Sequence, residues 1–223
     1  MLTLPKETEF AEQFKIIDPQ GIAVVRQYLL ESIATACQDR LFRLYQENRC
    51  GAYRVVAEDI DKRALRNVCL SYLAFTDQGE ELVSSHYEQA DNMTDTLAAL
   101  TAATKAQLAC QEELLADFEA QWSHDGLVMD KWFALQATRP DDDVLAIVEK
   151  LMAHPSFNFN NPNRVRALVG AFASQNPKAF HAVDGSGYRF LVEVLIKLNE
   201  SNPQVAARLI EPLIKLSRYD NQR

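Results

Sequence analysis

The chain has 223 residues, and its 48% hydrophobic and 24% charged content is ordinary for a globular protein with a sizeable core. The formal net charge of −8, with no basic stripe, argues against a nucleic-acid partner, because nucleic-acid affinity comes largely from basic side chains. No apolar run reaches the roughly 20 residues that span a bilayer, and no signal peptide opens the chain, so we expect a cytoplasmic protein without a membrane partner.

The composition favours helices, because only 7 residues are glycine and strong helix formers such as alanine and leucine are abundant. The first long helix should start at Asp18 and Pro19, since a capping acid followed by proline is typical of a helix N-terminus. Its apolar positions continue to Tyr45, which predicts either one long helix or two. A further helix is expected from Asp59, with apolar residues every three or four positions, and should end near Phe75.

Three more helices are expected in the middle of the chain. Residues 80–89 form a short one, Asn92 or Thr94 caps the next, and residues 112–123 carry apolar side chains along one side. We expect Gly126 to end the third of these helices in a left-handed conformation, which glycine adopts without steric cost.

The last third of the chain contains two Asn-Pro pairs that predict helix starts at Asn161 and Asn202. Each asparagine supplies a capping acceptor, and each proline stands at the first helical position, where its missing N–H costs nothing. The acidic residues 141–143 also mark a helix start, since a helix N-terminus favours negative charge, and not a metal site. Gly170 inside the helix from Asn161 suggests close approach of a neighbouring element. Residues 185–187 lack the lysine and spacing of a phosphate loop and predict a turn.

The cysteines and histidines show no spacing typical of a metal site. Cys37, Cys50, Cys69 and Cys110 form no Cys-x-x-Cys pair, and we expect mainly buried free thiols in a reducing compartment. A zinc site of the gluzincin type needs two histidines four apart with a glutamate beside the first. None of the four histidines has such a partner, so we expect surface or cap histidines, no metal, no cofactor and no catalytic residue in this chain.

The predicted fold is all-α. No alternating run is long enough for a strand, and residues 53–56 are too short to build a sheet. Successive amphipathic helices with short connections pack as antiparallel neighbours, and a long series of such pairs curves into a superhelical, α-solenoid-like array. The sequence shows no repeat of fixed length and no linker-like segment, so the superhelical interpretation depends mainly on a family resemblance.

Several segments together carry that resemblance. They are residues 92–95, 126–133, 161–172, 184–188 and 202–213. These segments closely resemble the C-terminal helical domain of the bacterial aminopeptidase N family, whose members are zinc-dependent alanyl aminopeptidases. The similarity runs from about Leu4 to Tyr219. The resemblance implies a single helical domain over residues 1–223, arranged as a curved array of helical hairpins. It also implies a fragment that lacks the catalytic domain and a terminal helical segment.

The resemblance implies a function for the parent protein. The family releases N-terminal residues from peptides with a zinc-activated water, and the zinc site belongs to the preceding catalytic domain. This helical domain would cap the active-site cavity and restrict it to small peptides, so its partners would be the catalytic domain and peptide substrates. The chain alone would not catalyse the reaction. The alternative is a free-standing helical-repeat scaffold that binds a peptide or a protein.

Three polar residues are candidates for contacts with substrate in that cavity: Gln204, Arg208 and Arg166. Gln204 and Arg208 begin a polar stripe that continues to Glu211 and Lys215, and spacing alone favours a solvated face with a weak Arg208–Glu211 pair. In the aminopeptidase N family, however, the positions that match Gln204 and Arg208 face the internal cavity, which implies contact with a peptide backbone or carboxylate. Arg166 could line the same cavity or pair with an acid of the next helix.

Overall fold

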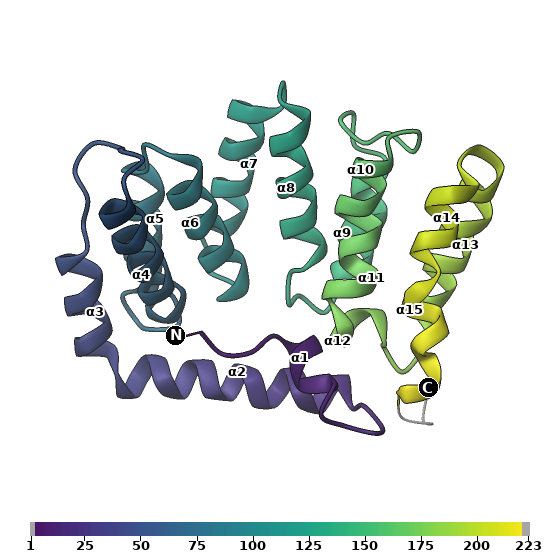
Figure 1. Ribbon diagram of the computed structural model, residues 1–223, viewed down its shortest axis with the longest axis horizontal. Coiled ribbons are helices and arrows are strands. Elements are labelled where there is room, and N and C mark those ends of the chain that lie inside the picture. Colours follow the sequence, from purple (N-terminus) through teal and green to yellow (C-terminus); the bar gives the residue numbers. More distant parts are fainter. Residues whose placement is uncertain (1–2, 220–223) are drawn as a thin grey trace. The chain divides into compact units, whose positions relative to one another are not determined.

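The computed structural model describes residues 3–219, and Figure 1 shows that this part of the chain is helical. It forms two compact units, one made of residues 3–4 and 25–118 and the other of residues 5–24 and 119–219. Within the described range no strand forms, and a single isolated parallel bridge joins Ile17 to Tyr219. The all-α prediction is confirmed, whereas the prediction of one domain over residues 1–223 stays a prediction.

The first unit is built from helices α2 to α7. Their bounds are α2 Pro19–Ala36, α3 Gln38–Glu47, α4 Ala57–Leu73, α5 Gly79–Glu88, α6 Met93–Lys105 and α7 Gln111–Trp122. The long helical stretch expected after Pro19 is thus two helices, divided at Cys37. α2 begins in the second unit and α7 ends in it. In the first unit α4 packs against α3 and α6, and α5 packs against α6.

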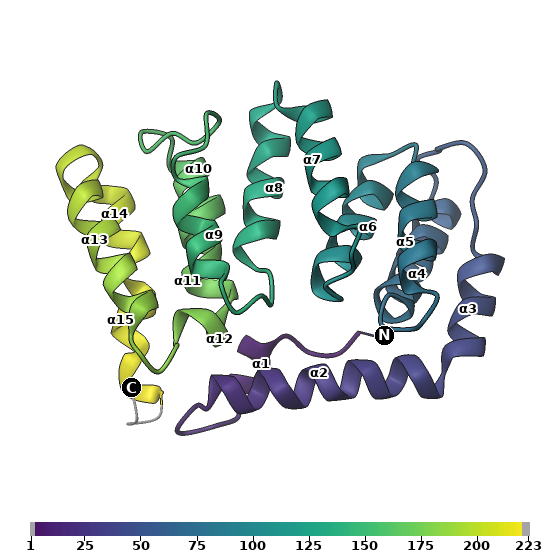
Figure 2. The same ribbon diagram turned by 180° about the vertical axis from the view of Figure 1, so that it is seen from behind.

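The second unit contains the remaining helical segments, most of which are short. They are α1 Glu7–Ala11, α8 Gly126–Ala137, α9 Val144–Leu151, α10 Pro162–Val165, a π-helix Arg166–Gly170, α11 Ala171–Gln175, α12 Pro177–Phe180, α13 Ser186–Ser201, α14 Pro203–Leu209, α15 Glu211–Ile214 and a 3₁₀ turn Lys215–Arg218. The short connection at Asn202 makes α13 and α14 antiparallel neighbours, which lie side by side when viewed from behind in Figure 2.

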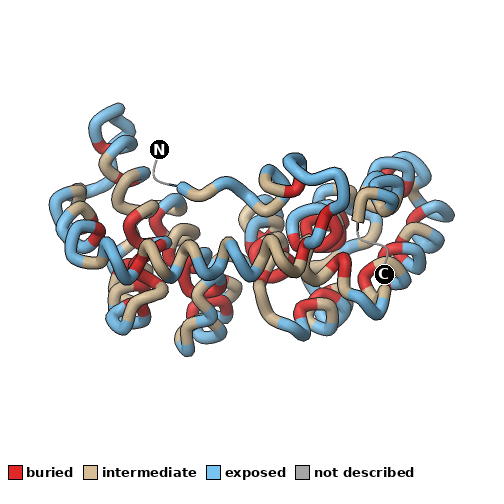
Figure 3. The backbone as a smooth tube through the Cα atoms, turned by 90° about the horizontal axis from the view of Figure 1, so that it is seen from below, coloured by how far each residue is buried: buried red, intermediate tan, exposed pale blue. Residues whose placement is uncertain are grey.

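Each unit has its own hydrophobic core. Figure 3 shows buried residues on the sides where the helices of a unit face one another. In the first unit Leu70, Leu100 and Phe118 are fully buried, and in the second unit Phe133 and Phe172 are. None of the helices described here combines the length and the apolarity that crossing a membrane requires.

The predicted capping residues occupy the expected positions. Asn161 accepts hydrogen bonds from the N–H groups of Asn163 and Arg164, at N···O distances of 3.0 and 3.4 Å. Asn202 accepts from the N–H of Val205 at 3.2 Å, and Asn92 caps α6 in the same way. These contacts satisfy N–H groups that have no partner within the helix, and they explain why short polar residues start these helices.

Two predicted helix ends are wrong. Gly126 does not end a helix in a left-handed conformation; it is the first residue of α8, because the carboxylate of Asp125 caps that helix by accepting from Leu127 and Val128. The helix from Asn202 does not run unbroken through the polar stripe either. It ends at Leu209, and a separate short helix follows with Pro212 in its first turn, since proline cannot donate the hydrogen bond that continuation would need.

The expected burial of the cysteines and histidines needs correction. All four cysteines are free, but only Cys69 is buried, and Cys37 is exposed. His86 is a buried core residue and not a surface or cap residue, whereas His181 is buried but does occupy the C-cap position of α12, as a cap histidine would. A tyrosine hydroxyl lies 2.8 Å from Nδ1 of each ring, so one polar atom of each buried imidazole has a hydrogen-bond partner.

Candidate functional site

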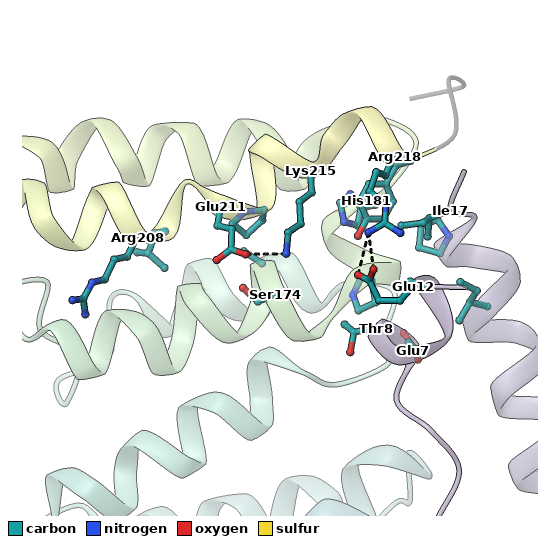
Figure 4. Close-up of a pocket in the computed structure, with 18 residues that line it drawn as sticks. Glu7, Thr8, Glu12, Ile17, Ser174, His181, Arg208, Glu211, Lys215 and Arg218 are labelled. Carbon is teal, nitrogen blue, oxygen red and sulfur yellow. Dashed lines mark hydrogen bonds and ion pairs between the residues drawn. The ribbon is translucent and has the colours of Figure 1, made fainter. Parts of the chain in front are cut away.

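The second unit contains a cavity of about 240 Å³, drawn in Figure 4. One side is formed by α1 and the start of α2, and the other by α11, α12 and the segment from α14 to the 3₁₀ turn. Of the three candidate residues from the sequence, Arg208 lines this cavity, while Gln204 and Arg166 do not. Arg208 is exposed, and Figure 4 shows its side chain extending away from Glu211 and Lys215.

Two ion pairs occupy the other end of the cavity. Arg218 Nη1 donates to both carboxylate oxygens of Glu12, at 3.1 and 2.9 Å, and its Nη2 donates to the carbonyl oxygen of Phe14 at 3.3 Å. Lys215 Nζ lies 2.8 Å from Glu211 Oε1. The hydrogen bond from Lys215 lowers the pKa of the Glu211 carboxyl, and the same contact raises the pKa of Lys215. These charges are therefore neutralised by neighbours within the unit.

An aromatic pair and a backbone hydrogen bond connect residues that line the cavity. The ring of Tyr219 stacks on His181 with centroids 3.4 Å apart, and His181 Nδ1 lies 2.8 Å from the hydroxyl of Tyr188. The N–H of Ile17 donates to the carbonyl oxygen of Arg218 at 2.7 Å. The 3₁₀ turn buries no residue of its own, and the hydrogen bonds of Arg218 with Glu12, Phe14 and Ile17 connect it to the N-terminal segment.

The packing of α14 explains why Gln204 and Arg208 face outward. Val205, Ala206 and Leu209 form the buried face of the helix. Gln204 and Arg208 lie one helical turn apart outside this face, and both side chains are exposed. Within the described chain Arg208 has no carboxylate within ion-pair distance and no hydrogen bond, and the expected Arg208–Glu211 pair does not form because Lys215 holds Glu211. Arg208 therefore presents a guanidinium group that can bind an anion or a carbonyl oxygen.

Arg166 lies at the start of the π-helix and is also exposed. Its Nε donates to the carbonyl oxygen of Pro162 at 3.0 Å and its Nη2 to Asn163 Oδ1 at 2.9 Å. Both acceptors are neutral and belong to its own segment. Pairing with an acid of the next helix, one of the two alternatives for Arg166, does not occur in the part of the chain that the structure describes. The roles of Arg166, Gln204 and Arg208 in substrate binding stay predictions.

The residues present do not fit a zinc ion. Across residues 3–219 no three histidine, cysteine, aspartate or glutamate side chains come together in a group that could hold a metal. His86 and Asp95 approach each other, with Nε2 3.9 Å from Oδ1, but His86 is buried and its other ring nitrogen contacts the hydroxyl of Tyr45. We therefore derive no metal chemistry from this chain.

Some contacts of this site had no signal in the sequence. Glu12 and Arg218 are 206 positions apart, and no local pattern connects them. The pair of Glu211 and Lys215, by contrast, has the four-residue spacing of a helical ion pair and could have been found. Away from the cavity, Arg164 is buried, its guanidinium group lies over the ring of Phe133, and its Nε lies 3.2 Å from Asp130 Oδ1; no local pattern predicts these contacts either.

Comparison with known proteins agrees with this architecture. A family model described as a domain of unknown function (DUF3458_C) with ARM repeats matches residues 1–223. Aminopeptidase N of Haemophilus influenzae is 65% identical over 223 residues, which cover 100% of this chain and 26% of that protein. Aminopeptidase N of Escherichia coli is 56% identical over 225 residues, with the same coverage of 100% and 26%.

A solved structure has the same fold. The crystal structure of Legionella pneumophila aminopeptidase A in complex with aspartic acid matches with a TM-score of 0.90 and 29% sequence identity, covering 99% of this chain and 27% of that chain. This chain spans about a quarter of the length of the relatives it matches. It belongs to the DUF3458_C family of ARM-repeat domains, and its predicted similarity to the helical domain of bacterial aminopeptidase N is confirmed.

Proposed function

We propose that this chain is the helical domain of a zinc-dependent aminopeptidase that releases N-terminal residues from peptides. In this proposal the domain caps the active-site cavity, limits access to small peptides and performs no catalysis of its own. The observation that carries it is the match over the whole chain to proteins that are called aminopeptidase N and are about four times as long. Zinc and the reacting groups would then belong to the remainder of the enzyme.

The outward face of α14 supports a role in substrate contact. Arg208 is exposed beside a cavity, lacks a carboxylate partner in the described residues, and follows Gln204 by one helical turn. We infer that Arg208 and Arg166 supply charge to the peptide backbone or to its terminal carboxylate, and that Gln204 adds an amide hydrogen bond. Legionella aminopeptidase A was crystallised with aspartic acid, so one structural relative of this chain binds an amino acid that carries carboxylates.

The partners of the domain follow from the same proposal. They are the catalytic part of the enzyme and small peptides, with no nucleic acid and no membrane. The four cysteines are free thiols, which supports a reducing, cytoplasmic location.

Activity and metal content of two proteins test the proposal. The 223-residue chain and the full-length protein that contains it are purified, dialysed, analysed for zinc, and assayed with an alanyl chromogenic substrate. We expect one zinc per chain and turnover from the full-length protein alone. Turnover or stoichiometric zinc in the 223-residue chain would contradict the assignment of catalysis to the remainder. A full-length protein without aminopeptidase activity would favour a helical scaffold that binds a protein or peptide.

A further inference from the structure

Gly170 stands where two segments of the proposed substrate surface meet. It is the last residue of the π-helix Arg166–Gly170, between α10 and α11. A Cβ atom built on Gly170 would lie 3.3 Å from Leu209 Cδ2, which is closer than side chains normally approach, and 3.7 Å from Arg166 Cβ. The absence of a side chain at Gly170 therefore leaves room for the side chain of Leu209, the last residue of α14.

This contact connects the two arginines that the function would use. Leu209 directly follows Arg208 and is buried, so the position of its side chain fixes the last turn of α14. The stem of Arg166 lies beside the same glycine, four residues earlier on the other segment. The distance between the Arg166 and Arg208 backbones is consequently set by how closely Leu209 can approach Gly170. π-helical turns of this kind often occur at functional sites.

We propose that Gly170 is a positioning residue that holds Arg208 and Arg166 at the spacing needed to contact one peptide substrate. The inference rests on the proposed function and deepens it, because it concerns the geometry of the same surface. Glycine is otherwise a poor choice inside a helix, where alanine is the stronger helix former. An alanine at this position would favour the helix while displacing Leu209 by a few tenths of an ångström, so folding should change little and spacing should change measurably.

The experiment uses the full-length aminopeptidase with Gly170→Ala. A displaced binding group loses contact with the substrate in the ground state and the transition state alike, so we expect the KM for a tripeptide to rise about three- to tenfold, with kcat and the KM of a one-residue chromogenic substrate unchanged. The matched control is Gly51→Ala, because a Cβ at Gly51 has no atom within 4 Å. Leu209→Val removes the atom that the added methyl group would meet, so the combined Gly170→Ala and Leu209→Val variant should recover most of the loss.

A background without the two guanidinium groups separates positioning from general disturbance. With Arg166→Ala and Arg208→Ala present, adding Gly170→Ala should cause no further loss on the tripeptide. An equal loss on both substrates, no recovery with Leu209→Val, or a further loss in the double-alanine background would overturn the inference. If the two arginine substitutions themselves leave tripeptide turnover intact, the proposed substrate surface is wrong. If they reduce it and Gly170→Ala does not, only the positioning inference fails.

Discussion

Replacing His86 with glutamine should reduce the acid sensitivity of folding. His86 is buried in the first unit, with Nδ1 2.8 Å from the hydroxyl of Tyr45. Arg66 donates from Nη2 to the same hydroxyl at 3.0 Å, so the hydroxyl proton is free to point at the imidazole. The Nε2 atom lies 3.9 Å from Asp95 Oδ1, too far for a direct hydrogen bond. The fold therefore favours the neutral ring.

The pKa of His86 falls from 6.5 to about 4, chiefly because burial disfavours the imidazolium and because Arg66 adds a like charge. Asp95 opposes the shift but does not cancel it. As the pH falls below 6.5 the unfolded chain takes up a proton that the folded chain does not, so the free energy of unfolding decreases until the pH reaches about 4. Between about pH 7.5 and pH 5 this one group should cost about 2 kcal/mol of stability.

Urea unfolding of the 223-residue chain, followed by far-ultraviolet circular dichroism at both pH values, measures the effect. His86→Gln cannot take up the proton, so its loss of stability between the two pH values should be about 2 kcal/mol smaller than that of the wild-type chain. His124→Gln is the matched control, because His124 is exposed, and it should behave as the wild-type chain does. An unchanged pH dependence in the His86 variant would refute the reasoning.

Two further predictions concern stability and are measured by the same unfolding experiment at neutral pH. The side-chain amide of the buried Asn176 donates to the carbonyl oxygens of Ala137 and Arg139, at 3.1 and 2.9 Å. Asn176→Ala should therefore lower the free energy of unfolding by about 1–3 kcal/mol, and a loss below about 0.5 kcal/mol would contradict this. A Cβ on Gly187 would overlap the backbone carbonyl of Phe180, so Gly187→Ala should cost at least about 2 kcal/mol, whereas Gly51→Ala should change stability by less than about 0.5 kcal/mol. Equal effects of the two glycine substitutions would show that this contact does not matter.

Local signals in the sequence predicted the helices well. The caps at Asn161 and Asn202 depend on a side chain and its own following residues, so their pattern is complete within four positions. The same reasoning failed at Asp125 and Gly126, where a glycine after an acid fits both a helix end and a helix start. The cap formed by Asp125, which accepts from two N–H groups, decided between them.

Tertiary contacts explain what the sequence could not show. The burial of His86 depends on a hydroxyl 41 positions away, and the cavity wall depends on Glu12 and Arg218, which are 206 positions apart. Spacing identified the outward face of α14 that carries Arg208, but only the family resemblance relates this face to substrate, and that relation stays a prediction. The burial of Arg164 beside Asp130 likewise needed the packing of α8 against the π-helix segment.

The kinetics of Arg208→Ala in the full-length protein that contains this chain test the central claim most directly. Removing one charge-assisted hydrogen bond costs about 1.5–3 kcal/mol, so kcat/KM for a tripeptide should fall roughly ten- to a hundredfold, while a one-residue chromogenic substrate is spared. The melting temperature should hardly change, since the Arg208 side chain is exposed and packs little. Arg189→Ala, at an exposed arginine on α13 away from the cavity, is the control. Equal losses on both substrates, or lower stability with unchanged kinetics, would contradict a role for this domain in contacting peptide substrates.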